Sequence, residues 1–208
     1  MNPSLPSKLS HALSLDPMLV LDVEGSGWGS PHALIEIGAV LVAHGDVLGR
    51  YSSLVRYRGR LNPMVTKLTG LKQDDLVDAP KLRGVLTGFS HFAESAKVLV
   101  GHGLSNDLAI VRHSYEICLM EPPTFLQLPT VCTVDLAPYV LPHWRRRSLS
   151  HLALGLSVPQ PTQHRALEDA ETTTLIYYRF KEALAGTVDL SEVPEPAPKV
   201  GVVVAHSS

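Results

Sequence analysis

Residues 18–24 read MLVLDVE, a short apolar run that ends in two carboxylates, Asp22 and Glu24. An apolar run of this length is typical of a strand that is buried on both faces of a sheet. Side chains two residues apart on a strand lie on the same face, so the two carboxylates point to one side. Buried carboxylates need a positive partner, and no Lys or Arg adjoins this pair. The run therefore predicts a central strand whose end holds Mg²⁺ or Mn²⁺, ions that prefer oxygen ligands.

The chain that follows predicts an α/β domain with a mixed central sheet flanked by helices. Strand-like runs over 33–42 and 47–57 are joined by His44-Gly45-Asp46, which is typical of a tight hairpin, so three antiparallel strands come first. A helix, a strand and a second helix come next, and this order predicts strands added in parallel. The elements expected after residue 60 are a strand over 97–101 and helices over 62–70, 79–96, 105–120, 135–140, 148–156 and 165–185.

Three more residues with catalytic chemistry lie far along the chain. Asp107 is expected near the start of the mid-chain helix, with Ser105 as its N-cap, and His164 and Asp169 lie at the start of the last helix. Each acid alone is more often an ordinary helix-dipole or loop carboxylate. Together, on elements that can converge at one end of an α/β sheet, they predict a metal site for phosphodiester hydrolysis, in which the histidine takes a proton from water.

Length and composition predict one domain over residues 14–186 and a flexible, Pro-rich tail over residues 187–208. A regular helix is excluded in the tail by Pro194, Pro196 and Pro198. The tail is therefore expected to be disordered or to bind a partner.

The two cysteines and the apolar runs indicate the cellular setting. Cys118 and Cys132 lack the spacing of a zinc site or of a disulfide framework, which favours free thiols in a reduced compartment. The N-terminal residues lack the pattern of a signal peptide, and no apolar run is long enough for a membrane span. We therefore expect a cytoplasmic protein with no membrane partner.

Two basic clusters interrupt a chain whose net charge is only −2. That net charge excludes nucleic-acid binding by bulk electrostatics alone. One cluster spans residues 143–147 and includes Trp144, and the other includes Tyr57. The cations of the second cluster are Arg50, Arg56, Arg58 and Arg60. Aromatic rings among cations are typical of a surface that binds single strands, but a solvated loop and an arginine-bearing edge strand fit equally well, so both interpretations stay open.

Three segments, around Asp22 and Glu24, around Asp107 and over 164–170, resemble the three motifs of the DEDDh-type 3′–5′ exonucleases. This DnaQ-like family, which includes the proofreading exonuclease of DNA polymerase III, belongs to the ribonuclease H-like superfamily. The resemblance covers residues 17–185, and its most specific part is HRALEDA at 164–170. It implies a ribonuclease H-like fold and an exonuclease domain. The connecting stretches that also resemble the family are 35–40, 68–80, 132–137 and 148–153.

The resemblance implies a role for each of the five residues. The implied ligands of two Mg²⁺ or Mn²⁺ ions across the scissile phosphate are Asp22, Glu24, Asp107 and Asp169. His164 would orient or deprotonate the attacking water. The implied reaction is 3′–5′ hydrolysis at single-stranded 3′ ends with release of nucleoside 5′-monophosphates, and DNA is the expected polymer. The other histidines, His102 and His151 among them, are expected to be structural.

Two alternatives stay open at this point. One is an exonuclease that acts on RNA 3′ ends or short oligoribonucleotides, and the other is a catalytically weak, exonuclease-like module that binds a polymerase or repair protein through the tail. The family often has Thr after the first-motif Glu and an aromatic residue before the second-motif Asp, where this chain has Gly25 and Asn106. That aromatic residue commonly stacks near the terminal base, so the sequence leaves the grip on the base and the choice between DNA and RNA open.

Overall fold

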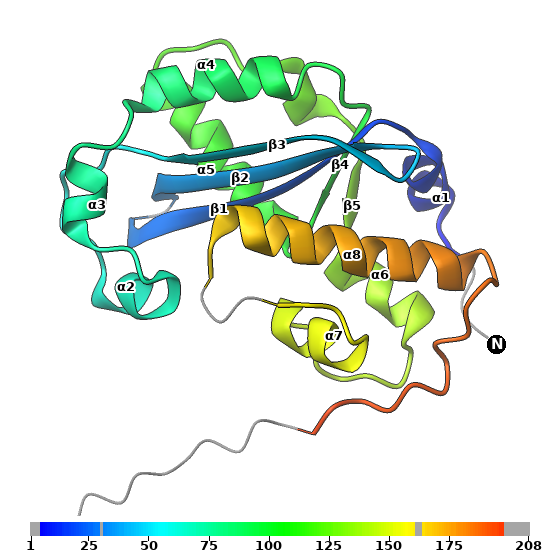
Figure 1. Cartoon of the computed structure of the whole chain (residues 1–208). Coiled ribbons are helices and arrows are strands. Elements are labelled where there is room, and N and C mark those ends of the chain that lie inside the picture. The colour runs from blue at the N-terminus through cyan, green and yellow to red at the C-terminus, as the bar shows by residue number, and fades with distance from the viewer. Residues whose placement is uncertain (1–4, 30, 161–163, 198–208) are drawn as a thin grey trace, which may run out of the picture.

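The computed structural model describes residues 5–29, 31–160 and 164–197. These residues form an α/β domain around a five-stranded sheet with the order β3-β2-β1-β4-β5 (Figure 1). The first three strands run antiparallel: β1 (Met18–Gly29), β2 (His32–Ala43) and β3 (Asp46–Leu54). Two short strands then pair in parallel: β4 (Val98–Gly101) with β1, and β5 (Thr130–Cys132) with β4. The predicted mixed sheet is confirmed, whereas β5 is too short to leave a pattern in the sequence.

The helices confirm most of the predicted elements and change some of their ends. They are α1 (Ser7–Ser14), α2 (Pro63–Thr69), α3 (Gln73–Val77), α4 (Leu82–Phe92), α5 (Leu104–Ile117), the 3-10 helix η1 (Thr124–Gln127), α6 (Thr133–Val140), α7 (Leu149–Gly155) and α8 (Ala166–Leu184). The sequence did not indicate α1 or α3, and Ala12 of α1 is buried, so the core extends before residue 14. The predicted cap of α5, Ser105, is wrong. Gly103 precedes the helix with a φ of 72° and turns the chain directly from β4 into α5.

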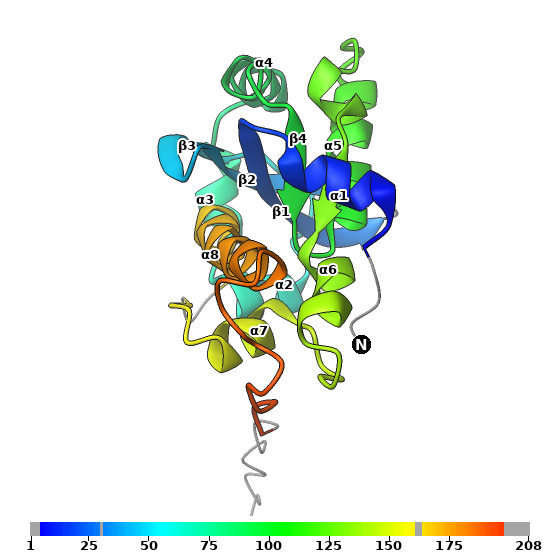
Figure 2. The ribbon, with the colours of Figure 1, turned by 90° about the vertical axis from the view of Figure 1, so that its right-hand side faces the viewer.

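Helices cover both faces of the sheet, and β1 is the strand that both layers share (Figure 2). Met18 and Val20 pack with the residues of α6, α7 and α8 on one face. Leu19 and Leu21 pack with the residues of α4 and α5 on the other face. This alternation means that the even-numbered side chains of β1, including Asp22, face the layer that contains α8.

Gly38 sets how closely α8 approaches the sheet. It is the partner of Asp22 in the pairing of β1 with β2. A Cβ atom at Gly38 would lie 2.1 Å from the backbone N of Leu167 and 2.2 Å from the carbonyl C of Ala166. The first turn of α8 therefore rests directly on β2, beside the first acid of the site.

The segment after α8 is not a free tail through residue 197, which corrects the expectation for residues 187–197. Leu190 is buried in the same core cluster as Trp144, and the carbonyl oxygen of Val193 accepts a 2.9 Å hydrogen bond from Trp144 Nε1. Burial of these apolar side chains holds the segment against the domain without a helix or strand. Residues 198–208 of the predicted tail lie outside the described residues.

The basic clusters are also only partly what the sequence indicated. Trp144 is 1% exposed, so the interpretation of this residue as a stacking platform is wrong. In the second cluster, Arg50 pairs with Glu171 of α8 and Arg56 Nε donates to the carbonyl oxygen of Ala79. These two arginines fix the β3 strand and the chain beyond it. Arg145 and Arg146 of the first cluster are exposed.

Substitution of Gly38 by alanine tests the contact between β2 and α8. We expect Gly38→Ala to destabilise the domain by about 3 kcal/mol or more, because the new methyl group would meet backbone atoms that cannot rotate away. Gly84→Ala is the matched control, because a Cβ atom at Gly84 of α4 meets nothing within 4 Å. That control should be neutral or stabilise the protein by up to about 1 kcal/mol. Equal stabilities of the two variants in urea unfolding would contradict this account of the packing.

Candidate active site

The middle of β1 forms the floor of the site because β4 stops short of it. β4 pairs with β1 only as far as Val20, so the main chain of β1 is open on that side beyond this residue. Asp22 and Glu24 lie just beyond this point, opposite Gly38 and Glu36 of β2. The two acids lie on one strand as the sequence predicted, but the strand does not end at them, because β1 continues to Gly29.

Asp107 reaches the open side of β1 from the first turn of α5. Its Oδ1 accepts a 3.2 Å hydrogen bond from the backbone N–H of Val23, a group that a longer β4 would have occupied. Asp107 is buried, with 6% of its surface exposed. Because Val23 lies between the two acids of β1, this contact brings the mid-chain acid to the first pair.

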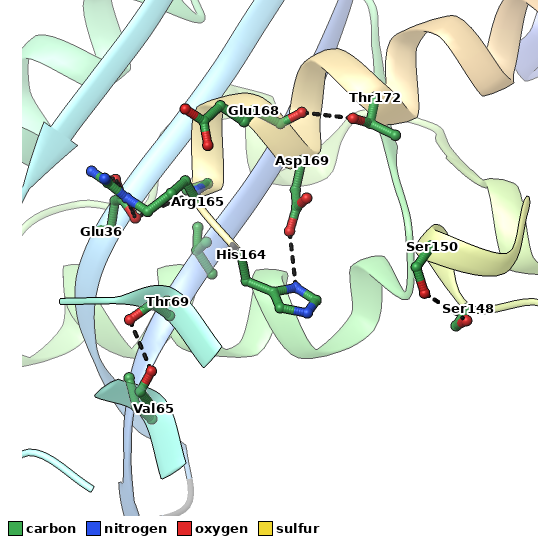
Figure 3. A network of polar contacts seen from close by, with 12 residues as sticks. Glu36, Val65, Thr69, Ser148, Ser150, His164, Arg165, Glu168, Asp169 and Thr172 are labelled. Carbon is green, nitrogen blue, oxygen red and sulfur yellow. Dashed lines mark hydrogen bonds and ion pairs between the residues drawn. The ribbon is translucent and has the colours of Figure 1, made fainter. Parts of the chain in front are cut away.

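α8 supplies the remaining two residues at its start. Asp169 is buried in the first turn of α8, and its Oδ2 lies 3.1 Å from Nδ1 of His164 (Figure 3). Ligand atoms of Glu24, His164 and Asp169 all lie within 4.8 Å of one another. The backbone N–H of His164 also donates to the carbonyl oxygen of Leu68 at the end of α2. Elements from four parts of the chain thus meet at one place.

An ion pair between a buried glutamate and a partly exposed arginine, which the sequence did not single out, fixes the start of α8. Glu36 is 2% exposed, and its carboxylate accepts hydrogen bonds from Nε and Nη2 of Arg165, at 3.0 and 2.8 Å (Figure 3). Removal of one partner from such a pair leaves a buried charge without compensation. The signal was present, because a glutamate between Ile35 and Ile37 on an inner strand requires a cation. Arg165 directly follows His164, so this pair also positions the histidine.

The four acids share an environment that opposes their ionisation. Burial and then repulsion by Asp107, Glu24 and the other acids raise the pKa of Asp22 well above its usual range. Burial, followed by repulsion from Asp169 and Glu36, raises the pKa of Glu24 to about 8. The pKa of Asp107 is raised to about 6 by burial, although the N–H of Val23 favours the charged form. Burial also raises the pKa of Asp169, against the effect of His164.

This donor set fits a divalent cation. Burial, with repulsion at Asp22 and Glu24, opposes ionisation of the four carboxylates, and among the described residues Arg165 only partly offsets this at Glu24 because it is bound to Glu36. A hard cation with oxygen ligands would favour their ionised forms. The residues that would hold it are Asp22, Glu24, Asp107 and Asp169.

His102, at the end of β4, has a structural environment. Its Nδ1 lies 2.9 Å from the hydroxyl of Thr133, which is fully buried. Burial lowers the pKa of His102 to about 4, and hydrogen bonding with the main chain of Arg147 only partly opposes this shift. The expectation that this histidine is structural agrees with its contacts, and they join the loop before α7 to the carboxyl end of β4.

An exposed apolar rim lies along α2 and the end of β1, and the sequence did not single it out. Trp28, Met64 and Leu68 are 51%, 57% and 48% exposed. Asn62 joins the two elements, because its side-chain Nδ2 donates to the carbonyl oxygen of Gly27. Leu68 is the residue whose carbonyl accepts from His164, so this rim adjoins the carboxylate site. A tryptophan within a run of glycines was the available signal.

Comparison with known proteins identifies the family. The family model described as "RNase_T: Exonuclease" matches residues 19–177, most of the chain. The chain belongs to the exonuclease family. This result confirms the predicted resemblance to the DnaQ-like 3′–5′ exonucleases of the ribonuclease H-like superfamily, and it confirms that the domain is a nuclease domain.

Individual relatives were found by sequence and by structure. The chain is 29% identical over 170 residues to the PolC-type DNA polymerase III of Oceanobacillus iheyensis. The matched region is 81% of this chain but only 12% of that polymerase. The structure of exonuclease X in complex with 5′-overhanging duplex DNA has a TM-score of 0.62, 21% identity, and coverage of 85% of this chain and 97% of that chain. The structure of a 3′-exonuclease that recognises the histone mRNA stem-loop has a TM-score of 0.67 and 16% identity, and the match covers 83% of this chain and 65% of that chain.

The raised pKa values predict a loss of stability with rising pH in metal-free protein. The folded protein retains protons on Glu24 up to about pH 8, whereas the unfolded chain releases them near pH 4.5, so stability falls as pH rises between these values. The lowered pKa of His102 makes stability rise with pH, but only below about pH 6.5. Between pH 6.5 and 8 in EDTA we therefore expect a loss of about 2 kcal/mol, or roughly 4–8 °C in Tm.

Two comparisons make this prediction specific. Addition of Mg²⁺ or Mn²⁺ should restore the Tm at pH 8, because the cation favours the ionised carboxylates. Glu24→Gln should flatten the pH dependence in EDTA. A metal-free Tm that stays constant or rises between pH 6.5 and 8 in thermal unfolding would contradict the proposed electrostatics.

Proposed function

We propose that this domain is a metal-dependent 3′–5′ exonuclease that cleaves single-stranded 3′ ends and releases nucleoside 5′-monophosphates. The observation that carries the proposal is the convergence of Glu24, His164 and Asp169, whose ligand atoms lie within 4.8 Å of one another. Asp22 and Asp107 belong to the same electrostatic cluster, since Asp107, Glu24 and Asp169 add to the effect of burial on the pKa of Asp22, and Asp107 also raises the pKa of Glu24. Bound Mg²⁺ or Mn²⁺, two ions per site, would activate water and stabilise the leaving 3′-oxygen.

The geometry supports a role for His164 as a proton acceptor. The contact with Asp169 favours the tautomer in which Nδ1 carries the proton, which would leave Nε2 as the base. His164 is half-exposed, with 49% of its side chain accessible, so water can reach it. Asp169 uses Oδ2 for this contact, so its Oδ1 would be left to hold a metal ion. One carboxylate would thus both orient the base and contribute to the metal site.

The exposed rim is the proposed contact of the terminal nucleotide. Trp28, Met64 and Leu68 offer exposed apolar surface on which a base can stack, and the carbonyl oxygen of Leu68 accepts a hydrogen bond from the backbone N–H of His164. This surface would compensate for Asn106, which replaces the aromatic residue that the family often has.

DNA is the proposed polymer because the chain is similar to part of a DNA polymerase, and a polymerase or repair protein is the proposed partner. A cytoplasmic location stays a prediction, and no helix among the described residues has the length and apolar character of a membrane span.

RNA remains the second candidate substrate, because the fold is shared with an exonuclease that recognises histone mRNA. The catalytically weak, exonuclease-like module that binds a partner is disfavoured by the complete set of four acids and a histidine. An assay with matched 5′-labelled DNA and RNA oligonucleotides, in Mg²⁺ and in Mn²⁺, separates the three possibilities. Stepwise shortening from the 3′ end supports the proposal, and absence of cleavage of both polymers would refute it.

Removal of a metal ligand should abolish this activity without unfolding the protein. We expect Asp22→Ala and Asp107→Ala to be inactive, and to be at least as stable as the parent in EDTA, because each removes a carboxyl group whose ionisation is opposed by burial and, at Asp22, also by neighbouring acids. Asp74→Ala is the control, since Asp74 is an exposed acid of α3. Parent-like hydrolysis by either site variant would remove that residue from the mechanism.

His164→Ala should reduce kcat by about 10²–10⁴, the range for loss of a general base, with metal affinity largely retained. Protonation of His164 should give the parent an acid limb in its pH–rate profile, and that limb should be absent from the variant. Calorimetric titration with Mn²⁺ measures the metal affinity separately. If rate and pH profile do not change at saturating metal, His164 is only a structural residue.

A further inference from the structure

The loop between α6 and α7 is held by the segment that follows α8. The indole of Trp144 is buried, and its Nε1 donates to the carbonyl oxygen of Val193. The ring of His143 contacts the same oxygen, at 2.8 Å from Nε2. Gly155 of α7 lies beneath this contact, because a Cβ atom there would meet both Trp144 and Pro196. An apolar anchor thus fixes one end of the loop.

Glu195 fixes the main chain of the same loop at its basic residues. Its Oε1 accepts hydrogen bonds from the backbone N–H groups of Arg145 and Arg146, at 3.1 and 2.8 Å. The same oxygen lies 3.2 Å from Nε2 of His151, which is buried against the indole of Trp144. A carboxylate with two N–H donors and an imidazole beside it is a specific arrangement rather than a chance surface contact.

The guanidinium groups of Arg145 and Arg146 take no part in this arrangement. Both side chains are exposed, and within residues 5–29, 31–160 and 164–197 no carboxylate lies within ion-pair distance of either. Glu195, the acid that contacts them, is bound through their main chain instead. Two adjacent cations are therefore available to an anion from outside the protein.

The loop between α6 and α7 also contacts the carboxyl end of the parallel strands, the edge of the sheet at which the proposed active site lies. The main chain of Arg147 hydrogen-bonds with His102, which directly follows β4. β4 runs parallel to β1, so the carboxyl end of β4 lies at the edge of the sheet where β1 bears Asp22 and Glu24. A strand whose 3′ end enters the site can therefore extend toward this loop.

We propose that Arg145 and Arg146 bind backbone phosphates of the single strand upstream of the scissile bond, and that Glu195 is the positioning residue that presents them. The inference rests on the proposed function and names a second substrate contact for it. Arginine recognises phosphate through paired N–H donors, and a fixed main chain reduces the entropy lost on binding. The segment over 187–197 would thus be a part of the substrate-binding surface.

The test compares a substrate that spans the loop with one that does not. We would measure hydrolysis of a 12-nucleotide DNA and of thymidine 5′-monophosphate p-nitrophenyl ester, which has a single phosphate. For Arg145→Ala/Arg146→Ala we expect KM for the 12-mer to rise about tenfold, with kcat and ester hydrolysis unchanged. Glu195→Ala should raise the same KM about threefold, and Glu195→Gln, which keeps an oxygen acceptor, should restore it.

A matched control removes two cations elsewhere. Lys8→Ala/Lys81→Ala alters exposed residues of α1 and of the turn before α4, remote from this loop, and should change KM less than twofold. Fluorescence anisotropy of the 12-mer in EDTA adds a direct readout. The slope of log affinity against log salt should fall in magnitude by about 1.4 in the arginine variant, as expected for two lost phosphate contacts on a single strand.

The outcomes separate this inference from the proposed function. An unchanged KM and salt slope in the double arginine variant, or losses equal to those of the lysine control, would overturn the role of the loop. If Glu195→Ala does not fold, the double arginine variant alone decides whether the loop binds the substrate. If the parent hydrolyses neither substrate, the proposed function fails, and the anisotropy measurement still tests phosphate binding.

Discussion

Burial and repulsion of four carboxylates around the middle of β1 are the constraint on which the rest of the structure depends. Asp22, Glu24, Asp107 and Asp169 come from three elements; burial raises the pKa of all four, and repulsion between acids adds to it at Asp22 and Glu24. An apolar core has to hold these elements together against that repulsion. The core does so with a central strand that packs on both faces, so its end cannot move without disturbing both layers.

Three local features position the acids, namely two glycines that act through the main chain and one ion pair with a buried carboxylate. Gly38 lets the first turn of α8 rest on β2, and Glu36 binds Arg165 at the same turn. Gly103 turns the chain from β4 into α5, which carries Asp107 to the N–H of Val23. Because these supports are distinct from the acids, a substitution at an acid can remove chemistry and leave the architecture intact.

The sequence predicted the parts of this arrangement that have a local pattern. The apolar run before Asp22, the hairpin after β2 and the long amphipathic α8 were all correct, and so was the prediction that the acids would meet. Other features depend on contacts between distant residues, which periodicity does not record. Trp144 looked like a surface aromatic among arginines, yet Val193 and Leu190, nearly fifty residues later, bury it. Ser105 had the chemistry of a cap, but the geometry of Gly103 decided where α5 begins.

The short length of β4 has a consequence for how such a domain can lose or gain activity. Since β4 pairs with β1 only through Val20, the site depends on a strand that ends early. An insertion that lengthened β4 by two residues would keep the apolar layers, and a backbone carbonyl would accept from the N–H of Val23 in place of Asp107. Asp107 would then be excluded from its place, and the domain would become a stable but inert scaffold. Strand length, rather than any side chain, would be the simplest means of converting this enzyme into a binding module.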